Sequence, residues 1–377
     1  MILLTGGAGF IGSHVLTELN NRGYDDIVIV DEAGESKWQN LVGKSFRAYY
    51  SVTEFYGNLA SPRHTFPAAV CPKPEIIIHL GAEVNTQNFD FDMMMSMNFN
   101  PSVRLAHFAT NYNARFIFAS SAAIYGDGSA SFDDSSIRDA PFNVALGPKN
   151  LTTQNIARSP YAISKQLVED HCRRSAMPEN WVIFRLFNVY GLNEFHKNES
   201  ASIIHQWLTQ PIISKHVPLR LFRSNNEKYI DGGQKRDFIC VSDVARVIVN
   251  AAINPPIVSG VYNLGTGQPR SFNEVAAFIL KNRGLDNPLS DELVLSEYID
   301  YISMPKELSS CFQNYTKAKM TKLNNAMDVG DIVPLGHGIK RLAKQLKKRG
   351  DLGRDITQKI TSAEKDLFER DRMASEL

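Results

Sequence analysis

A serine, a tyrosine and a lysine stand at a spacing that could support proton transfer to and from a hydroxyl group. An apolar run ends in Ser121, and Tyr161 and Lys165 follow about forty residues later, four positions apart. On a helix, two residues four apart project from one face. A phenol is a poor base at neutral pH, but a nearby ammonium group favours its phenolate. Tyr161 could therefore exchange a proton with a substrate hydroxyl while Ser121 hydrogen-bonds the reacting oxygen and a cofactor takes hydride from the same carbon.

A glycine-rich turn near the start of the chain could bind that cofactor. An apolar run at 2–4 leads into Gly6, Gly9 and Gly12, a helix-like stretch follows, and a second apolar run at 27–30 ends in Asp31. Glycines let backbone N–H groups approach a pyrophosphate, a helix N-terminus favours negative charge, and the acid binds ribose hydroxyls. The pattern predicts a dinucleotide-binding unit, and its three-residue glycine step resembles that of the extended short-chain dehydrogenase/reductase superfamily.

We expect a tightly bound NADP or NAD. Asp31 and Glu32 would repel a 2′-phosphate, whereas Lys37 could reach one. The resemblance slightly favours NADP, and Glu32 argues for NAD. The expected cofactor contacts are Gly6, Gly9, Phe10, Ile11, Gly12, Asp31, Glu32, Lys37, Leu80, Gly81, Ala82, Asn98, Tyr161, Lys165 and Val189.

Composition excludes several other classes of protein. The 377 residues contain 41 Lys plus Arg and 40 Asp plus Glu, so a formal charge of +1 offers no broad positive field for nucleic acid or an anionic membrane. Four scattered cysteines form no CxxC pair, which predicts no metal site and a reducing compartment. No apolar run approaches the roughly 18 residues of a membrane span, and glycines interrupt the start before it could form a signal-peptide core. We therefore expect a cytoplasmic protein.

The elements that must position these residues follow an alternating pattern. Apolar runs at 75–80, 116–119 and 181–186 alternate with helix-length stretches such as 98–110 and 162–174. Such alternation predicts an α/β fold with a doubly wound parallel sheet whose strand ends share one rim. We expect a Rossmann domain at 1–190 with a return segment at about 236–265. A smaller interleaved α/β substrate domain would take 191–235 and 266–340, and 341–377 would form a charged C-terminal extension.

Over roughly residues 1–340 the sequence resembles the bacterial ADP-glyceromanno-heptose 6-epimerases, a branch of that superfamily. The resemblance rests on the segments 185–191, 235–238 and 263–267 and, most specifically, on the pair His196-Lys197. It implies that Lys197 is a second proton-transferring group, across the substrate from Tyr161. Hydride would leave one face of the sugar carbon C6, the resulting ketone would turn in the site, and hydride would return to the other face. Tyr161 and Lys197 would each transfer the proton in one of the two orientations of the sugar.

The resemblance also implies substrate contacts at Ser121, Asn188, Lys197, Glu199, Gln206, Phe222, Arg236 and Phe312. Arg236 would suit bidentate binding of a phosphate. Several of these positions depart from the family: Glu199 replaces a small hydroxyl residue, Gln206 stands near a displaced histidine, and Cys311-Phe312 replaces an Arg-Tyr pair. The loop at 223–234 is longer as well. The sequence therefore supports the chemistry better than the identity of the sugar nucleotide.

Related enzymes on this scaffold remain as alternatives. Sugar 4,6-dehydratases need an acid pair after the catalytic hydroxyl, where this chain has Ala122-Ala123. A nucleotide-sugar 4-epimerase shares Ser followed by Ala, and a keto-sugar-nucleotide reductase could use the same residues. A non-catalytic Rossmann subunit is disfavoured because Tyr161 and Lys165 are both present. We expect a small-molecule nucleotide-sugar substrate and a homo-oligomer, without nucleic acid or membrane partners.

Overall fold

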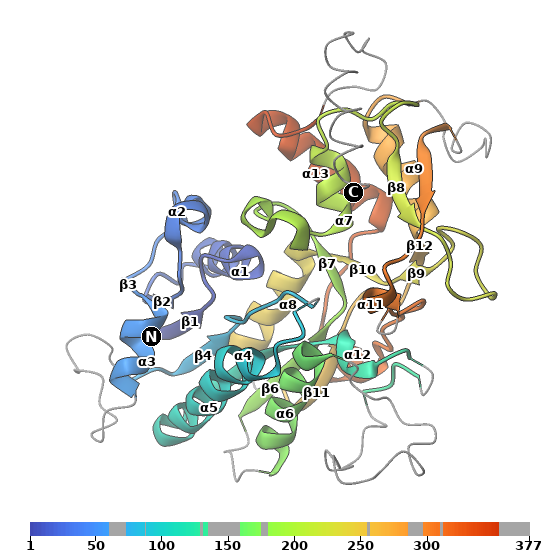
Figure 1. Ribbon diagram of the computed structural model, residues 1–377. Coiled ribbons are helices and arrows are strands. Elements are labelled where there is room, and N and C mark those ends of the chain that lie inside the picture. Colours follow the sequence, from blue (N-terminus) through green and yellow to red (C-terminus); the bar gives the residue numbers. More distant parts are fainter. Residues whose placement is uncertain are drawn as a thin grey trace, which may run out of the picture.

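The computed structural model describes residues 1–59, 73–86, 88–128, 131–134, 159–174, 180–254, 257–285, 297–309 and 312–353 (Figure 1). Cys71, Cys311, most of the stretch before Tyr161 and the end of the proposed C-terminal extension lie outside these ranges. Within the described ranges, no helix is long and apolar enough to cross a membrane. The same residues contain no cluster of three or more His, Cys, Asp or Glu side chains that could hold a metal ion.

Seven parallel strands form the central sheet, in the order β11-β6-β5-β4-β1-β2-β3. Strand β1 lies between β2 and β4, with Ile2 opposite Ile27 on one side and Ile76 on the other. Because the chain winds outward from β1 in both directions, the predicted doubly wound sheet is confirmed, and its switch point lies between β1 and β4. The strands are β1 (Ile2–Thr5), β2 (Ile27–Val30), β3 (Ala48–Tyr50), β4 (Ile76–His79), β5 (Arg115–Ser121), β6 (Trp181–Leu186) and β11 (Gly260–Leu264).

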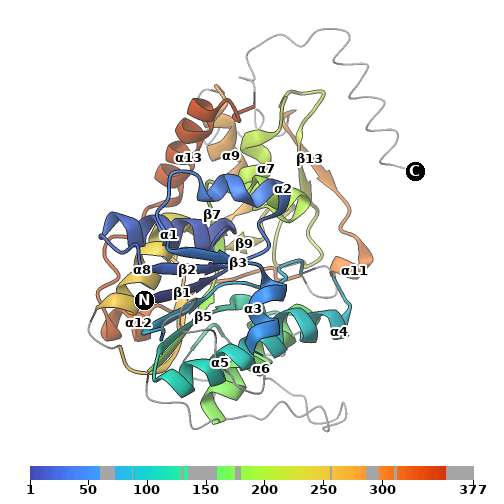
Figure 2. The same ribbon diagram turned by 90° about the vertical axis from the view of Figure 1, so that its left-hand side faces the viewer.

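Helices cover both faces of this sheet, as Figure 2 shows. One face packs against α1 (Phe10–Asn21) and α8 (Val241–Ile253), and the other against α3 (Val52–Leu59), α5 (Asn100–Tyr112) and α6 (Pro160–Arg174). The strands are buried on both faces, which explains why they read as continuous apolar runs. Short elements lie at the loops: α2 (Gly34–Lys37), η1 (Trp38–Leu41), α4 (Phe91–Met94), the π-helical turn η2 (Met95–Phe99), η3 (Ala122–Tyr125) and α12 (Thr321–Ala326).

A smaller unit groups together at the top of Figures 1 and 2 and has its own core. Its helices are α7 (Ile203–Thr209), α9 (Phe272–Asn282) and α13 (Leu335–Arg349). The short helix η4 (Phe195–Ser200) precedes α7 in the chain, and α11 (Lys306–Ser309) follows β13 (Ile299–Ile302). Its strands form three pairs: β7 (Asn188–Tyr190) with β10 (Phe238–Cys240), β8 (Leu219–Phe222) with β13, and β9 (Lys235–Arg236) with β12 (Arg270–Ser271).

Helix α13 runs through the boundary expected at residue 340. Leu342 and Leu346 are buried in the core of the smaller unit, whereas Lys340, Lys344 and Lys347 are exposed. Charged residues at helical spacing hid this apolar stripe in the sequence. At least the first part of the segment proposed as an extension is therefore packed structure.

Candidate active site

Ser121, Tyr161 and Lys165 meet at the carboxyl end of β5. Ser121 is the last residue of β5, and the other two lie one turn apart on α6. Helix α6 begins here because Ser159 caps it, and its hydroxyl accepts a hydrogen bond from the backbone N–H of Ala162. The Ser121 hydroxyl lies close enough to the Tyr161 phenol to lower its pKa. The two hydroxyl groups expected to face a reacting oxygen therefore lie side by side.

Burial dominates the charge state of this trio. The Lys165 ammonium donates a hydrogen bond to the Ala119 carbonyl at 2.9 Å and lies over the rings of Phe118 and Tyr161. Desolvation lowers the pKa of Lys165 to about 7. Desolvation also raises the pKa of Tyr161, and this effect exceeds the opposing effect of the nearby Ser121 hydroxyl. In the ligand-free site the phenol is protonated at neutral pH, so it needs a further favourable interaction to act as a base.

A buried ion pair fixes α6 against the sheet. Glu169, one turn beyond Lys165, accepts hydrogen bonds from the Ser120 hydroxyl at 2.6 Å and from the Arg185 guanidinium. Burial alone would raise the pKa of Glu169, but the charge and hydrogen bonds of Arg185 lower it below its ordinary value. Removing one partner of such a pair typically costs about 3–5 kcal/mol. The pair therefore holds the helix that presents Tyr161 and Lys165.

The glycine turn between β1 and α1 fits an approaching pyrophosphate. Gly6 has φ +72°, and a Cβ on it would lie 2.6 Å from the backbone nitrogen of Gly81. A Cβ on Gly12 would overlap the carbonyl oxygen of Gly6, which is backbone and cannot rotate away. Gly9 precedes α1, which starts at Phe10 and directs its first N–H groups to this turn. Ile11 of α1 and Val189 of β7 are partly buried. Both pack against the hydrophobic core between the central sheet and helices α1 and α8.

The end of β2 carries the groups expected to bind a ribose. The Asp31 carboxylate accepts hydrogen bonds from the N–H groups of Ala8 at 2.9 Å and Gly9 at 3.1 Å, and it lies 3.2 Å from the Lys37 ammonium. The neighbouring Glu32 carboxylate accepts a hydrogen bond from the backbone N–H of Val52, the first residue of α3. Two carboxylates thus flank this end of the site, and Lys37 is already paired with one of them.

A chain of hydrogen bonds through His79 fixes the loop after β4. The Gly81 N–H donates to the Thr5 hydroxyl, which contacts His79 Nδ1, and His79 Nε2 contacts the Ser102 hydroxyl, which donates to the Asn98 carbonyl. Burial lowers the pKa of His79 to about 3, so the ring is neutral, and this chain places its proton on Nε2. It brings together four expected cofactor contacts, Leu80, Gly81, Ala82 and Asn98, beside the glycine turn.

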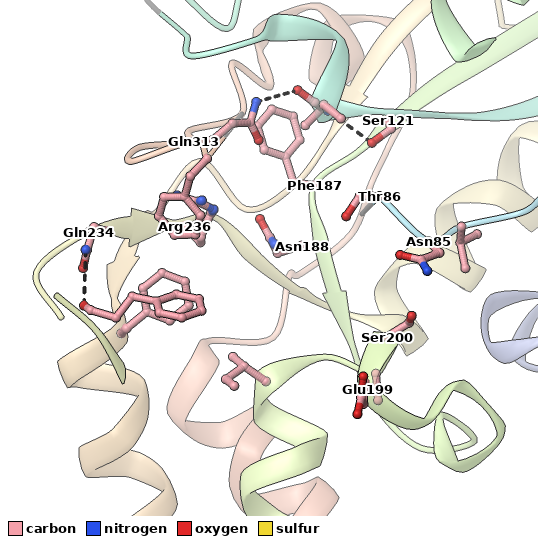
Figure 3. Close-up of a pocket in the computed structure, with 18 of the residues that line it drawn as sticks. Asn85, Thr86, Ser121, Phe187, Asn188, Glu199, Ser200, Gln234, Arg236 and Gln313 are labelled. Carbon is pink, nitrogen blue, oxygen red and sulfur yellow. Dashed lines mark hydrogen bonds between the residues drawn. The ribbon is translucent and has the colours of Figure 1, made fainter. Parts of the chain in front are cut away.

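A cavity of about 630 Å³ opens beside Ser121. In Figure 3, Asn85 and Thr86 lie on the same side as Ser121, Arg236 lies on the opposite side, and Asn188 projects between them. Arg236 is 6% exposed, and its guanidinium carbon lies 4.6 Å from the centre of the Phe312 ring. Burial lowers the pKa of Arg236 to about 9. A guanidinium that lies over the rings of Phe272 and Phe312 at the wall of a cavity suits an anionic ligand.

Most of the expected substrate contacts line this cavity, namely Ser121, Asn188, Glu199, Phe222, Arg236 and Phe312. Gln206 is not among the lining residues: its side-chain amide donates hydrogen bonds to the backbone carbonyls of Glu199 and Ala201. It therefore shapes the segment that carries Glu199.

Lys197 also lies apart from the cavity lining. Its ammonium is 3.3 Å from the Glu194 carboxylate and 5.2 Å from the centre of the Phe10 ring, at the start of α1. The backbone turns sharply straight after it, because Asn198 has φ +46°. Lys197 therefore faces the glycine turn, whereas Glu199 reaches the cavity.

Sequence reasoning missed several lining residues, including Asn85, Thr86, Phe187, Trp207 and Gln313 as contacts. Asn85 and Thr86 carried a usable signal, since they follow the carboxyl end of a predicted parallel strand. Gln313 is placed by tertiary structure: its amide donates to the carbonyls of Ala122 and Gly126, a contact between segments nearly 190 positions apart.

A doubly wound sheet with a glycine turn at its switch point and a Ser-Tyr-Lys set beside a cavity defines a class of nicotinamide-dependent enzymes. Residues 2–265 match the NAD dependent epimerase/dehydratase family, and the chain belongs to that family. The glycine turn and the two carboxylates after β2 fit its nicotinamide dinucleotide cofactor.

Two similar proteins carry the same name. An ADP-L-glycero-D-manno-heptose-6-epimerase of Nitratidesulfovibrio vulgaris (strain DP4) is 35% identical over 352 residues, covering 93% of this chain and 99% of the relative. One from Fusobacterium nucleatum is 31% identical over 342 residues, covering 90% and 96%.

Solved structures of lower identity share the fold. The Helicobacter pylori ADP-L-glycero-D-manno-heptose-6-epimerase superposes with a TM-score of 0.66 at 24% identity, covering 92% of this chain and 96% of that one. The Thermus thermophilus UDP-glucose 4-epimerase in complex with NAD gives 0.65 at 21% identity, covering 92% and 98%.

Proposed function

We propose that this protein is a nucleotide-sugar epimerase that inverts C6 of an ADP-heptose or a related nucleotide-heptose. The observation that carries the proposal is the placement of the Ser121-Tyr161-Lys165 set at one side of a cavity whose opposite side holds the buried Arg236. A sugar bound at the first side and a diphosphate near the second would span this cavity. The shared name of the relatives at 31–37% identity supports the C6 of a heptose as the reacting centre.

The residues divide the proton transfers between them. A bound nicotinamide dinucleotide supplies the reversible hydride acceptor, held at the glycine turn and by Lys165. Tyr161 takes the proton from the C6 hydroxyl, and Ser121 hydrogen-bonds that oxygen as it becomes a ketone. Lys165 stabilises the phenolate by its charge. After the ketone turns, Lys197 serves the opposite orientation.

We further propose NAD as the preferred cofactor. A 2′-phosphate on the adenosine ribose would meet the carboxylates of Asp31 and Glu32, and Lys37 is already paired with Asp31. Heat-denatured protein should release NAD and little NADP. A released pool that is mostly NADP would contradict this preference. The homo-oligomer expected from the sequence stays a prediction, which light scattering of the holoenzyme would check.

The decisive experiment follows stereochemistry at individual carbons. Purified protein is incubated with ADP-L-glycero-D-manno-heptose and, separately, with UDP-glucose in deuterated solvent, and the products are examined by NMR. We expect inversion at C6 of the heptose without solvent deuterium at that carbon, because hydride returns directly. Inversion at C4 of the glucose alone would replace the proposal with a 4-epimerase. Net reduction of a keto sugar would replace it with a reductase, and no conversion together with no bound dinucleotide would reject the proposed function.

A further inference from the structure

A single buried carboxylate holds together the segment that carries Lys197. This segment, residues 191–202, joins β7 to α7, and we call it the lysine loop. Glu194 is 0% exposed. It accepts hydrogen bonds from the Gly191 N–H at 3.1 Å at the start of the loop, and from the N–H and hydroxyl of Ser202, both at 2.6 Å, at its end. One side chain thus closes the loop.

The same carboxylate is the ion-pair partner of Lys197, at 3.3 Å. Two histidines also lie near this lysine, His196 on the loop and His205 on α7. Burial lowers the pKa of His196 to about 4 and also lowers that of His205, so both are neutral at neutral pH. Within the described residues, Glu194 is therefore the one acid paired with the Lys197 ammonium. Its charge matters more than it would on a surface, because the acid is fully buried.

The lysine loop is also fastened to the cofactor-binding helix. Asn193 donates from its amide to the Ser13 hydroxyl at 3.0 Å, and the Leu192 carbonyl lies 3.0 Å from His14 Nε2, with Ser13 and His14 both on α1. The burial-lowered pKa of His14, about 4, leaves its ring neutral. These contacts fix the start of the lysine loop against α1.

We propose that Glu194 is the positioning residue for Lys197: it fixes the loop at both ends and holds the ammonium beside the glycine turn. The inference rests on the proposed function, since that function gives Lys197 its chemical role. Glu194 itself does not reach the cavity lining. It therefore acts through Lys197.

The first test is a double-mutant cycle on the holoenzyme with the C6 epimerisation assay. Glu194→Gln preserves the shape of the side chain and removes its charge, and we expect kcat to fall by about ten- to a hundredfold, the range typical of a misplaced catalytic group. In a Lys197→Ala background the same substitution should cause no further loss, because the group it positions is gone. An equal fall in both backgrounds would show a general structural role and overturn the proposal.

A matched control separates this effect from the loss of any buried ion pair. Asp243 on α8 is also a buried carboxylate. Like Glu194, it pairs with a cation three residues further on, Arg246, and accepts a hydrogen bond from a backbone N–H. Asp243→Asn should lower the melting temperature and leave kcat nearly unchanged. If Glu194→Gln fails to fold, Glu194→Asp keeps the charge on a shorter side chain. We expect Glu194→Asp to lower kcat when Lys197 is present and not in the Lys197→Ala background. An equal fall of kcat in both backgrounds would again overturn the proposal.

The second test does not depend on turnover. Competitive acetylation with acetic anhydride, read by mass spectrometry, compares Lys197 with the exposed Lys340 in the same protein. Release from Glu194 should make Lys197 react several-fold faster in Glu194→Gln than in the wild type, while Asp243→Asn leaves the ratio unchanged. An unchanged ratio in Glu194→Gln overturns the proposal even in an active enzyme. If the wild type epimerises no nucleotide-heptose, the proposed function fails, and the acetylation ratio still decides whether Glu194 holds Lys197.

Discussion

Replacing Lys165 with methionine should stabilise the ligand-free protein while abolishing its turnover. Burial lowers the pKa of Lys165 from the ordinary 10.5 to about 7. Between these values the unfolded chain keeps the proton and the folded site does not, so the unfolding free energy rises with pH by about 1.4 kcal/mol per pH unit. Over the whole interval the gain is about 5 kcal/mol. Below pH 7 both states are protonated, and the folded protein bears the full penalty of a buried charge.

Methionine has a similar length and does not titrate, so the variant escapes that penalty. It also loses the hydrogen bond to the Ala119 carbonyl, which costs about 1 kcal/mol. The variant should therefore be more stable than the wild type by about 4 kcal/mol at low pH, and this advantage should disappear as pH rises from 7 towards 10.5.

Urea unfolding of nucleotide-free wild type and Lys165→Met at about pH 6 and about pH 9 measures both quantities. Other ionisable groups cancel in the difference between the two proteins. An advantage of the variant that does not change between the two pH values would refute the assignment of the penalty to this lysine. A variant less stable than the wild type at the lower pH would show that the ammonium is well solvated or paired in the folded protein.

Three further substitutions test the proton transfer by Tyr161, the binding of the dinucleotide at the glycine turn and the binding of the substrate's phosphate by Arg236. Tyr161→Phe should lower kcat by about a thousandfold while bound dinucleotide stays, as measured by turnover and absorbance of the holoenzyme; turnover near the wild-type rate would contradict its role. Gly12→Ala should abolish dinucleotide binding in a fluorescence titration, because its Cβ overlaps backbone, whereas Gly57→Ala, in open space on α3, should bind normally. Arg236→Met should raise KM for the nucleotide sugar at least about tenfold with a smaller change in kcat, and an unchanged KM would place the anion elsewhere.

The sequence predicts well where Ser121, Tyr161 and Lys165 lie, because their placement depends on local rules. Tyr161 and Lys165 share a helix face, and Ser121 ends a strand that any parallel sheet would place at the same rim. The same holds for the glycine turn, whose positive φ at Gly6 and close approach at Gly12 follow from residue type and spacing. These features need no knowledge of contacts between distant segments.

The substrate side could be predicted only in part, because it is built from distant segments and short loops. The direction of Lys197 depends on the left-handed Asn198 and on the buried Glu194, and a polar loop gives no sign of either. The position of Gln313 beside Ala122 depends on how the chain returns after the smaller unit. The packing of helix α13 into the smaller core was hidden because its charges exceed its apolar residues, although Leu342 and Leu346 repeat at helical spacing.

The near-zero net charge of the chain conceals an uneven distribution at the site. Lys165 and Arg236 are both buried, and within the described residues neither has a carboxylate partner; Lys165 donates to the Ala119 carbonyl, and Arg236 to the carbonyl of Lys235. Burial lowers both pKa values, to about 7 and about 9, which means that the ligand-free fold disfavours both charges. A phenolate on Tyr161 would offset the first, and a diphosphate at the cavity wall would offset the second. A ligand with a diphosphate should therefore stabilise the fold, because it satisfies the Arg236 cation, which has no acidic partner among the described residues.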